Sequence, residues 1–297
     1  SSTWLTLTVA GLAMGMIIFI IASGLTLVFG LMDVLNFGHG VFIALGAFVA
    51  TSVLGGMADW TASEQLWRNL VAVFSAMLVA MAVAGAVGLA FERCIVRPVY
   101  GQHLKQILIT MGGMIIGEEL IKVIWGPQQI PLPLPTTLRG SFVIGDASIE
   151  KYRVLAVAIG LVVFALLLFA LNRTKVGLLI RAGVQDREMV ESLGYRIVRL
   201  FIGVFVAQIW VLSRTKIGLL IRAGVQDREM VESLGYRIRR LFVGVFAVGS
   251  ALAGLGGVMW GLYQQNVVPQ MGAQVNVLIF IVIIIGGLGS TGGALIG

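Results

Sequence analysis

Three uncharged apolar stretches are each long enough to cross a lipid bilayer, and they constrain the fold more than any other feature of the chain. They cover residues 4–29, 70–91 and 154–171, and the last 57 residues, after Arg240, also contain no Asp, Glu, Lys or Arg. A helix needs roughly 20 apolar residues to span the hydrocarbon core. Transmembrane strands would alternate apolar and polar residues, which these stretches do not. The sequence therefore predicts an all-α polytopic membrane protein.

The composition supports a membrane protein and explains the basic charge. Only 12% of the residues are charged and 58% are hydrophobic, whereas about a quarter of the residues of a soluble domain are charged. The net charge of +7 could indicate nucleic-acid binding. However, the basic residues lie beside the predicted spans, where the excess of Lys and Arg in cytoplasmic loops explains them more simply. Cys94 is the only cysteine, so no disulfide forms within the chain.

About seven spans are predicted, with the N-terminus outside. They cover residues 4–29, 41–54, 70–91, 107–125, 154–171, 241–263 and 275–297. This arrangement places both strongly basic connections, 92–106 and 173–240, in the cytoplasm. It places the acidic connection 55–69 and the Pro-rich loop 126–153 outside, and it requires the short run 41–54 to cross. Because the chain ends within an apolar segment, we expect a further C-terminal helix beyond it.

One basic region occurs twice in the sequence as a near-identical repeat. Residues 173–205 and 214–246 differ only at the pairs Val176/Ile217, Val198/Arg239 and Ile202/Val243, and residues 173–240 hold 13 of the 21 basic residues. The apolar segment 200–212, from the end of the first copy to just before the second, would form a helix of about 20 Å, which is too short for a core of about 30 Å. A crossing there would also put the second basic copy outside, so we expect this segment not to span. The near identity indicates a recent duplication or an error in assembling the sequence.

Each copy predicts a short helix with one apolar side. Asp186 or Asp227 suits its start, and Gly194 or Gly235 suits a left-handed stop. The apolar side carries Met189 with its neighbours Val190 and Leu193. Such a helix is either a docking element or an ordinary helix of a cytoplasmic loop.

Polar residues lie between the first two predicted spans and within the fourth. Asp33, Asn36 and His39 either line a translocation path or belong to a satisfied helix break. Glu118 and Lys122 have the spacing of a local ion pair, beside Glu119, and we expect this pair to be structural. Near the end of the chain, the small residues Ala253, Gly254, Gly256 and Gly257 permit close helix contact. The glycine run 286–293 lacks the Lys of a phosphate-binding loop, and we expect it to serve close packing or an unwound turn.

Four blocks resemble the permease subunits of ATP-binding-cassette importers for branched-chain amino acids and related amides, the LivH/LivM type that includes urea importers. The blocks are ASGLTLVFGLMDVLNFGHGVFIALGAFVA (22–50), ERCIVRPVYGQ (92–102), LAGLGGVMWGLYQQ (252–265) and IIIGGLGSTGGALIG (283–297). They follow the family's order over nearly the whole chain. The resemblance implies a transmembrane subunit that is not itself an enzyme and moves small amino acids or amides into the cytoplasm.

The resemblance also implies where the chain couples to its energy source. In such permeases a cytoplasmic loop carries a coupling helix, with Glu followed six positions later by Gly, which fits Glu188/Gly194 and Glu229/Gly235. The second copy leads directly into the family-like residues 241–263, so we expect it to be the working loop. The expected coupling residues are Asp227, Glu229, Met230, Val231, Leu234 and Gly235, with Glu188 and Gly194 in the first copy, and the expected path residues are Asp33, Asn36, His39 and Glu118.

The implied assembly has several members. It includes cytoplasmic ATPase subunits that hold ATP and Mg²⁺, since this chain has no cofactor of its own, together with a second permease and a periplasmic binding protein in the bacterial inner membrane. The chain would then consist of membrane helices in residues 1–171, the coupling region 172–240 and further membrane helices in residues 241–297. Two alternatives stay open: an ion-coupled secondary transporter or channel that uses Glu118 and Asp33, and a membrane scaffold whose repeated loop only binds a partner.

Overall fold

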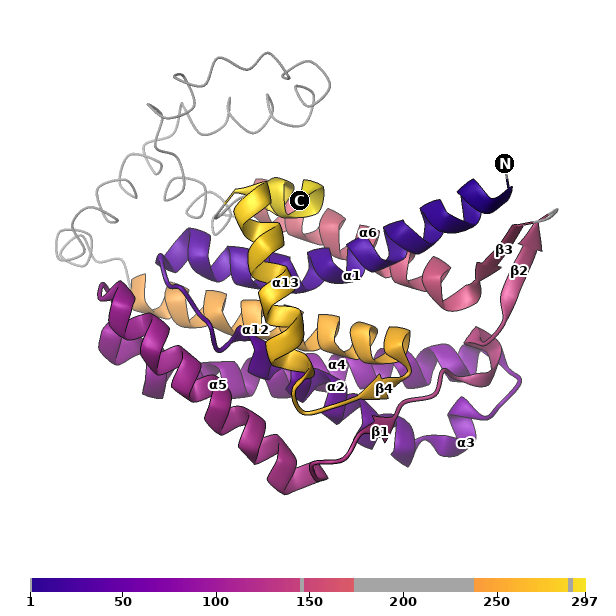
Figure 1. Cartoon of the computed structure of the whole chain (residues 1–297), viewed down its shortest axis with the longest axis horizontal. Coiled ribbons are helices and arrows are strands. Elements are labelled where there is room, and N and C mark those ends of the chain that lie inside the picture. Colours follow the sequence, from indigo (N-terminus) through magenta and orange to yellow (C-terminus); the bar gives the residue numbers. More distant parts are fainter. Residues whose placement is uncertain (1, 145–146, 174–237, 288–290) are drawn as a thin grey trace, which may run out of the picture. The chain divides into compact units, whose positions relative to one another are not determined.

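A computed structural model describes residues 2–144, 147–173, 238–287 and 291–297 (Figure 1). The chain divides into two compact units, residues 1–163 with 243–297, and residues 164–242. Most of the second unit, which corresponds to the predicted coupling region, lies outside the described residues. The fold given below is that of the first unit.

The described residues are mainly helical, which confirms the predicted all-α class. The helices are α1 (Ser2–Met32), α2 (His39–Gly56), α3 (Ala58–Thr61), α4 (Leu66–Phe91), α5 (His103–Trp125), α6 (Lys151–Arg173), α12 (Ile238–Gln264), α13 (Met271–Gly286) and α14 (Thr291–Ile296). Short turns of π and 3₁₀ helix, Glu92–Val96 and Arg97–Val99, join α4 to α5, and a 3₁₀ turn covers Thr136–Leu138. Two small antiparallel pairs join β1 (Ile130–Pro131) to β4 (Asn266–Val267), and β2 (Ser141–Ile144) to β3 (Ala147–Glu150).

Five of the described helical segments are long and apolar enough to cross a membrane. They are Thr3–Gly30, His39–Gly56, Leu66–Val99, Lys151–Phe169 and Phe242–Gln264, and each contains a predicted span or all but one or two of its residues. The predicted span 107–125 lies within α5, which has 23 residues. That helix is long enough to cross, but Glu118, Glu119 and Lys122 fall in its second half.

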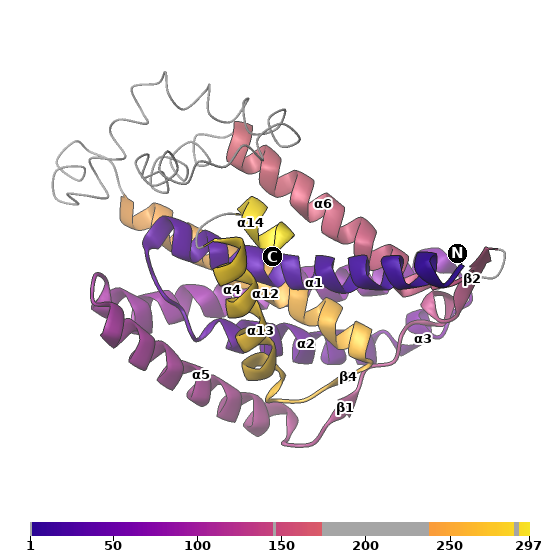
Figure 2. The same cartoon turned by 45° about the horizontal axis from the view of Figure 1, so that its top comes forward.

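The predicted seventh span, residues 275–297, is wrong as a single helix. α13 ends at Gly286, and the next residue, Gly287, has a φ of 91° that favours glycine. α14 then folds back along α13: a Cβ on Gly286 would collide with the carbonyl of Gly293, and one on Gly297 would lie 2.6 Å from the Val282 oxygen. The close packing predicted for this glycine run is therefore confirmed. α13 itself runs steeply across α1 and α12, as both views show (Figures 1 and 2).

α2 is the central helix of the unit, because every residue from His39 to Ala50 is buried. It contacts α4 and α13, and glycines bring it against its neighbours. A Cβ on Gly46 would collide with Gly254 of α12, and one on Gly257 would collide with the carbonyl of Ile43. The close contact predicted for the small residues of α12 is therefore confirmed. Helices enclose α2, so its 18 residues, about 27 Å of helix, need not match the full bilayer.

The ends of the helices agree with the predicted topology. The Phe91 ring at the end of α4 stacks on Phe246 near the start of α12, with 6.1 Å between centroids. The basic connection that follows α4 therefore shares one end of the bundle with the start of α12. At the other end, the Tyr152 hydroxyl donates to the Met259 carbonyl at 2.7 Å. The connection after α2 and the Pro-rich loop also meet, since the Thr136 hydroxyl donates to the Thr61 carbonyl.

Candidate functional site

The break between α1 and α2 lies inside the helix bundle. Asp33 ends α1 with a left-handed φ of 51°, and residues 34–38 are not helical. Nε2 of His39, the first residue of α2, donates to the carbonyl of Ile21 at 3.1 Å. Ile21 lies roughly three turns, or about 16 Å, before the end of α1. The chain therefore turns back along α1 before α2 begins, and the N-terminus of α2 is at the level of the middle of α1.

Side chains from two other helices satisfy the backbone of this break. The Phe37 N–H donates to Oγ1 of Thr110 on α5 at 3.2 Å, and the Phe37 carbonyl accepts from Nδ2 of Asn276 on α13 at 2.9 Å. The Phe37 ring stacks on Phe280 of α13, with 4.5 Å between centroids. Non-helical backbone at membrane depth is tolerated only where protein or water satisfies it. α5 and α13 therefore hold the break in place.

Several polar atoms beside the break have no partner among the described residues. Asn36 is fully buried, yet neither its Oδ1 nor its Nδ2 makes a hydrogen bond, and the same is true of Nδ1 of His39 and Oδ1 of Asn276. A Cβ on Gly38, the residue that precedes α2, would lie 3.1 Å from the Asn36 Oδ1. The Asn36 carboxamide therefore lies over the N-terminus of α2. Each such buried group costs about 1–3 kcal/mol, so this cluster is suited to a polar ligand that would satisfy it.

An aromatic cluster lies on the other side of the break. Gly38 packs directly against the Phe91 ring, and Phe91 contacts Phe42 edge-to-face at 5.4 Å between centroids. Phe246 completes the cluster at 6.1 Å from Phe91. The N-terminus of α2 is therefore bordered by uncharged polar groups and by apolar rings.

Comparison with known proteins assigns the chain to a family. The family model of the branched-chain amino acid transport system permease component matches residues 7–209 and 200–297. The chain belongs to this family. The two matches overlap in residues 200–209, which run from the end of the first copy of the repeat into the segment that follows it.

Several curated relatives cover almost all of this permease. The high-affinity branched-chain amino acid transport system permease protein BraD of Pseudomonas aeruginosa is 27% identical over 298 residues, which cover 97% of this chain and 81% of the relative. The corresponding LivH proteins of Escherichia coli K12 and Salmonella typhimurium are 24% identical over 294 residues, which cover 97% of this chain and 80% of each relative. No solved structure matches the chain significantly.

The four predicted path residues of the permease do not form one site. Asn36 and His39 lie together at the break. The Asp33 side chain is 70% exposed at the end of α1, with its Oδ2 3.6 Å from Nε2 of His103. Glu118 lies about two turns beyond Thr110 on α5, and the hydrogen bonds of the break do not include it.

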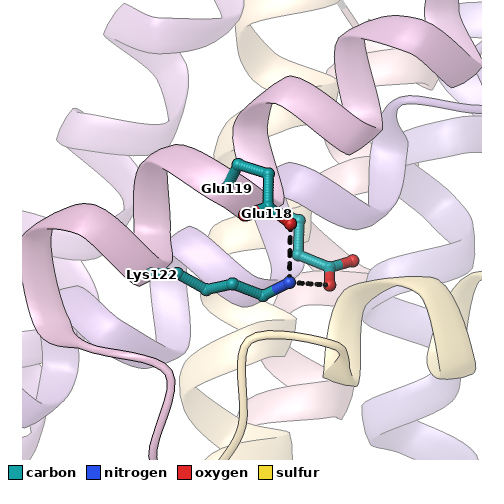
Figure 3. Close-up of polar contacts among 3 residues, drawn as sticks. All are labelled: Glu118, Glu119 and Lys122. Atoms are coloured by element: carbon teal, nitrogen blue, oxygen red, sulfur yellow. Dashed lines mark hydrogen bonds and ion pairs between the residues drawn. The ribbon is translucent and has the colours of Figure 1, made fainter.

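Glu118 instead belongs to an ion-pair cluster, the α5 triad of Glu118, Glu119 and Lys122 (Figure 3). Nζ of Lys122 lies 3.0 Å from Oε1 of Glu118 and 2.7 Å from Oε1 of Glu119. The predicted local pair of Glu118 and Lys122 is therefore confirmed, and Glu119 joins it. The side chains of Glu118 and Lys122 are about one-fifth exposed, whereas that of Glu119 is 63% exposed.

Two residues that bond the backbone of the break, Asn276 of α13 and Thr110 of α5, were not predicted from the sequence. Asn276 is the one polar residue in the apolar run 275–285, and this exception could have identified it. Thr110 carries no such signal, because a threonine within a helix usually bonds its own helix. Thr110 does so here as well, through the carbonyl of Gln106 at 2.6 Å.

The predicted coupling residues lie outside the described residues. They are Asp227, Glu229, Met230, Val231, Leu234 and Gly235, with Glu188 and Gly194 of the first copy.

A cavity of about 270 Å³ lies beside the start of α13, at the end of the bundle away from the basic connection 92–106. Trp260 and Gln264 of α12 line one side, and Met271 and Gln274 of α13 line another. α13 therefore borders an opening near the predicted outer surface and also contacts the break through Asn276.

Proposed function

We propose that this chain is the transmembrane permease subunit, of the LivH/LivM type, of an ATP-binding-cassette importer. Its substrates are branched-chain amino acids or similar small amino acids and amides, which it moves into the cytoplasm of a bacterium across the inner membrane. The observation that carries the proposal is the family match, which covers residues 7–297 in two overlapping parts.

The helix break supports a translocation path through Asn36 and His39, to which Thr110 and Asn276 are added. Transport proteins bind substrate beside interrupted helices, because the free ends of such helices offer polar groups within the membrane. α13 borders the outer cavity, and its Asn276 donates a hydrogen bond to the Phe37 carbonyl of the break. A movement of α13 would therefore connect the cavity with the break. We expect the path to open and close by this movement.

Each end of the helix bundle is assigned its own partners. ATPase subunits, which hold ATP and Mg²⁺, dock on the cytoplasmic end that carries the basic connection 92–106. Coupling uses the second copy of the repeat, through Asp227, Glu229, Met230, Val231, Leu234 and Gly235, with Glu188 and Gly194 as their counterparts in the first copy. A periplasmic binding protein delivers substrate at the opposite end, and a second permease subunit completes the pore.

Reconstitution tests this function directly. We expect the chain to co-purify with a candidate ATPase subunit and, together with a binding protein in liposomes, to take up labelled leucine only when ATP is supplied. Replacing Glu229 and Gly235 together should lower uptake by about tenfold or more by weakening the docking of the ATPase. Failure to associate, with uptake unchanged in the double variant, would contradict the proposal.

The same vesicles separate this function from an ion-coupled transporter. That alternative uses the carboxylates of Glu118 and Asp33. The structure pairs Glu118 with Lys122, and Asp33 lies exposed at the end of α1, 3.6 Å from His103. Uptake driven by a proton or sodium gradient in vesicles that contain this chain alone would support the alternative. The absence of flux under any energisation would instead support a scaffold.

A further inference from the structure

We propose that the N-terminus of α2 and the carboxamides beside it form a binding subsite for the zwitterionic head group of a free amino acid in transit. This inference rests on the proposed function and deepens it, because it names the groups that distinguish an amino acid from other small molecules inside the membrane. It begins from the unpartnered atoms of the break.

The carboxylate end of the substrate has two donors available. The N-terminus of a helix carries a partial positive charge and favours anions, and α2 begins inside the bundle with 18 residues behind it. Asn36 adds its Nδ2, which is fully buried and has no acceptor among the described residues. Its Oδ1 lies over Gly38, so the carboxamide is held at this helix end.

The ammonium end of the substrate has three acceptors available. Oδ1 of Asn36 and Oδ1 of Asn276 are both buried and unpartnered in the described structure. Nε2 of His39 donates to the carbonyl of Ile21, which leaves the buried Nδ1 of that neutral ring as an acceptor without a donor. All three groups lie at the break, since Asn276 of α13 is bonded to Phe37. An ammonium group has three N–H donors and would satisfy them.

The side chain of the substrate has an apolar neighbour in the rings of Phe42, Phe91 and Phe246. Gly38 separates the Phe91 ring from the Asn36 Oδ1, and a Cβ at this position would collide with the ring. Because the residue between them is a glycine, the Phe91 ring and the Asn36 carboxamide are adjacent surfaces. The ring would contact the apolar part of a substrate, and the carboxamide would contact its head group. Polar groups that are left unpaired reject analogues more strongly than apolar pockets do, so the head group is where this subsite selects.

A charge change at Asn36 tests the proposal. Asn36→Asp keeps acceptors for the ammonium but repels the carboxylate, so it should disfavour leucine and tolerate leucinamide, which has no carboxylate. The assay measures ATP-driven uptake of both labelled compounds by the complete complex with an unaltered binding protein. Because the binding protein is the same in every sample, a change in the leucinamide-to-leucine ratio comes from the permease. We expect this ratio to rise by about tenfold or more.

Truncations provide a second measurement. Asn36→Ala and Asn276→Ala should each lower leucine uptake by about tenfold, while ATP hydrolysis stimulated by the binding protein stays within about twofold of the unaltered complex. A purely structural role would lower uptake and hydrolysis together. Thr26→Val is the matched control, because the Thr26 hydroxyl is also buried and unpartnered but belongs to α1 outside the break.

The outcomes separate this subsite from the proposed function. An unchanged ratio in Asn36→Asp, together with normal uptake in both truncations, would overturn the subsite and leave ATP-driven import intact. If Asn36→Ala does not fold, the ratio measured with Asn36→Asp and the leucine uptake of Asn276→Ala decide instead. No ATP-driven uptake by the unaltered complex would overturn the proposed function, and the subsite with it.

Discussion

Two groups of polar residues lie within the helical bundle of this permease, and they differ in charge, burial and pairing. At the α1–α2 break the groups are uncharged, buried and partly without partners, as Asn36 shows. In the α5 triad they are charged and partly exposed, and Lys122 is bonded to both carboxylates. Charge inside a membrane is costly unless it is paired, and the triad meets this condition within one helix. Of these two groups, the neutral one at the break is therefore the one that leaves polar atoms available to a passing molecule.

The largest expected effect concerns the helix that carries the break. In Gly257→Val the new side chain would collide with the carbonyl of Ile43, and α2 is enclosed on every side. We expect a loss of about 3 kcal/mol or more of stability, measured as thermal unfolding of the purified protein in detergent. Gly112→Val on α5 is the matched control, since a Cβ there meets nothing within 4 Å. Equal unfolding temperatures for the two variants would contradict the central position of α2.

A smaller effect is expected from removing one bond of the break. Asn276→Asp keeps the size of the side chain, but an ionised aspartate cannot donate to the Phe37 carbonyl, which then loses its partner at 2.9 Å. The expected loss of stability is about 1–3 kcal/mol. Thermal unfolding beside the unaltered protein measures it, and an unchanged midpoint would show that α13 does not hold the break.

A smaller effect still is expected in the α5 triad. In Glu118→Gln, Lys122 keeps its bond to Glu119 at 2.7 Å, so the charge remains paired. We expect the unfolding midpoint to move by no more than about 3 °C and ATP-driven leucine uptake to be unchanged. A loss of uptake would place the triad on the path and erase the difference between the two groups.

The smallest effect is expected at Asp33. Its side chain is mostly exposed and its contact with His103 spans 3.6 Å, and exposed ion pairs contribute little. Asp33→Asn should change neither the unfolding midpoint nor leucine uptake. Defective uptake in this variant would extend the path to the end of α1.

Local patterns predicted much of this fold, and long-range contacts account for what they missed. Apolar stretches located the spans, and the polar residues of the segment 31–40 located the break, because both are properties of consecutive residues. The small residues of α12 indicated close packing, although not which helix would lie against them. The partners of Phe37 are 73 and 239 residues away, so no local pattern connects them. The split of residues 275–297 depends on the backbone conformation at Gly287, which an apolar run does not reveal.

The hydrogen bond between Phe37 and Asn276 has a consequence for biosynthesis. Its two residues are separated by 239 positions, so the ribosome adds all of these residues before the Phe37 carbonyl can meet its donor. During that interval the nascent α1–α2 pair enters the bilayer with an unpaired carbonyl, which lipid does not satisfy. We expect translocation machinery or trapped water to cover that group until α13 emerges.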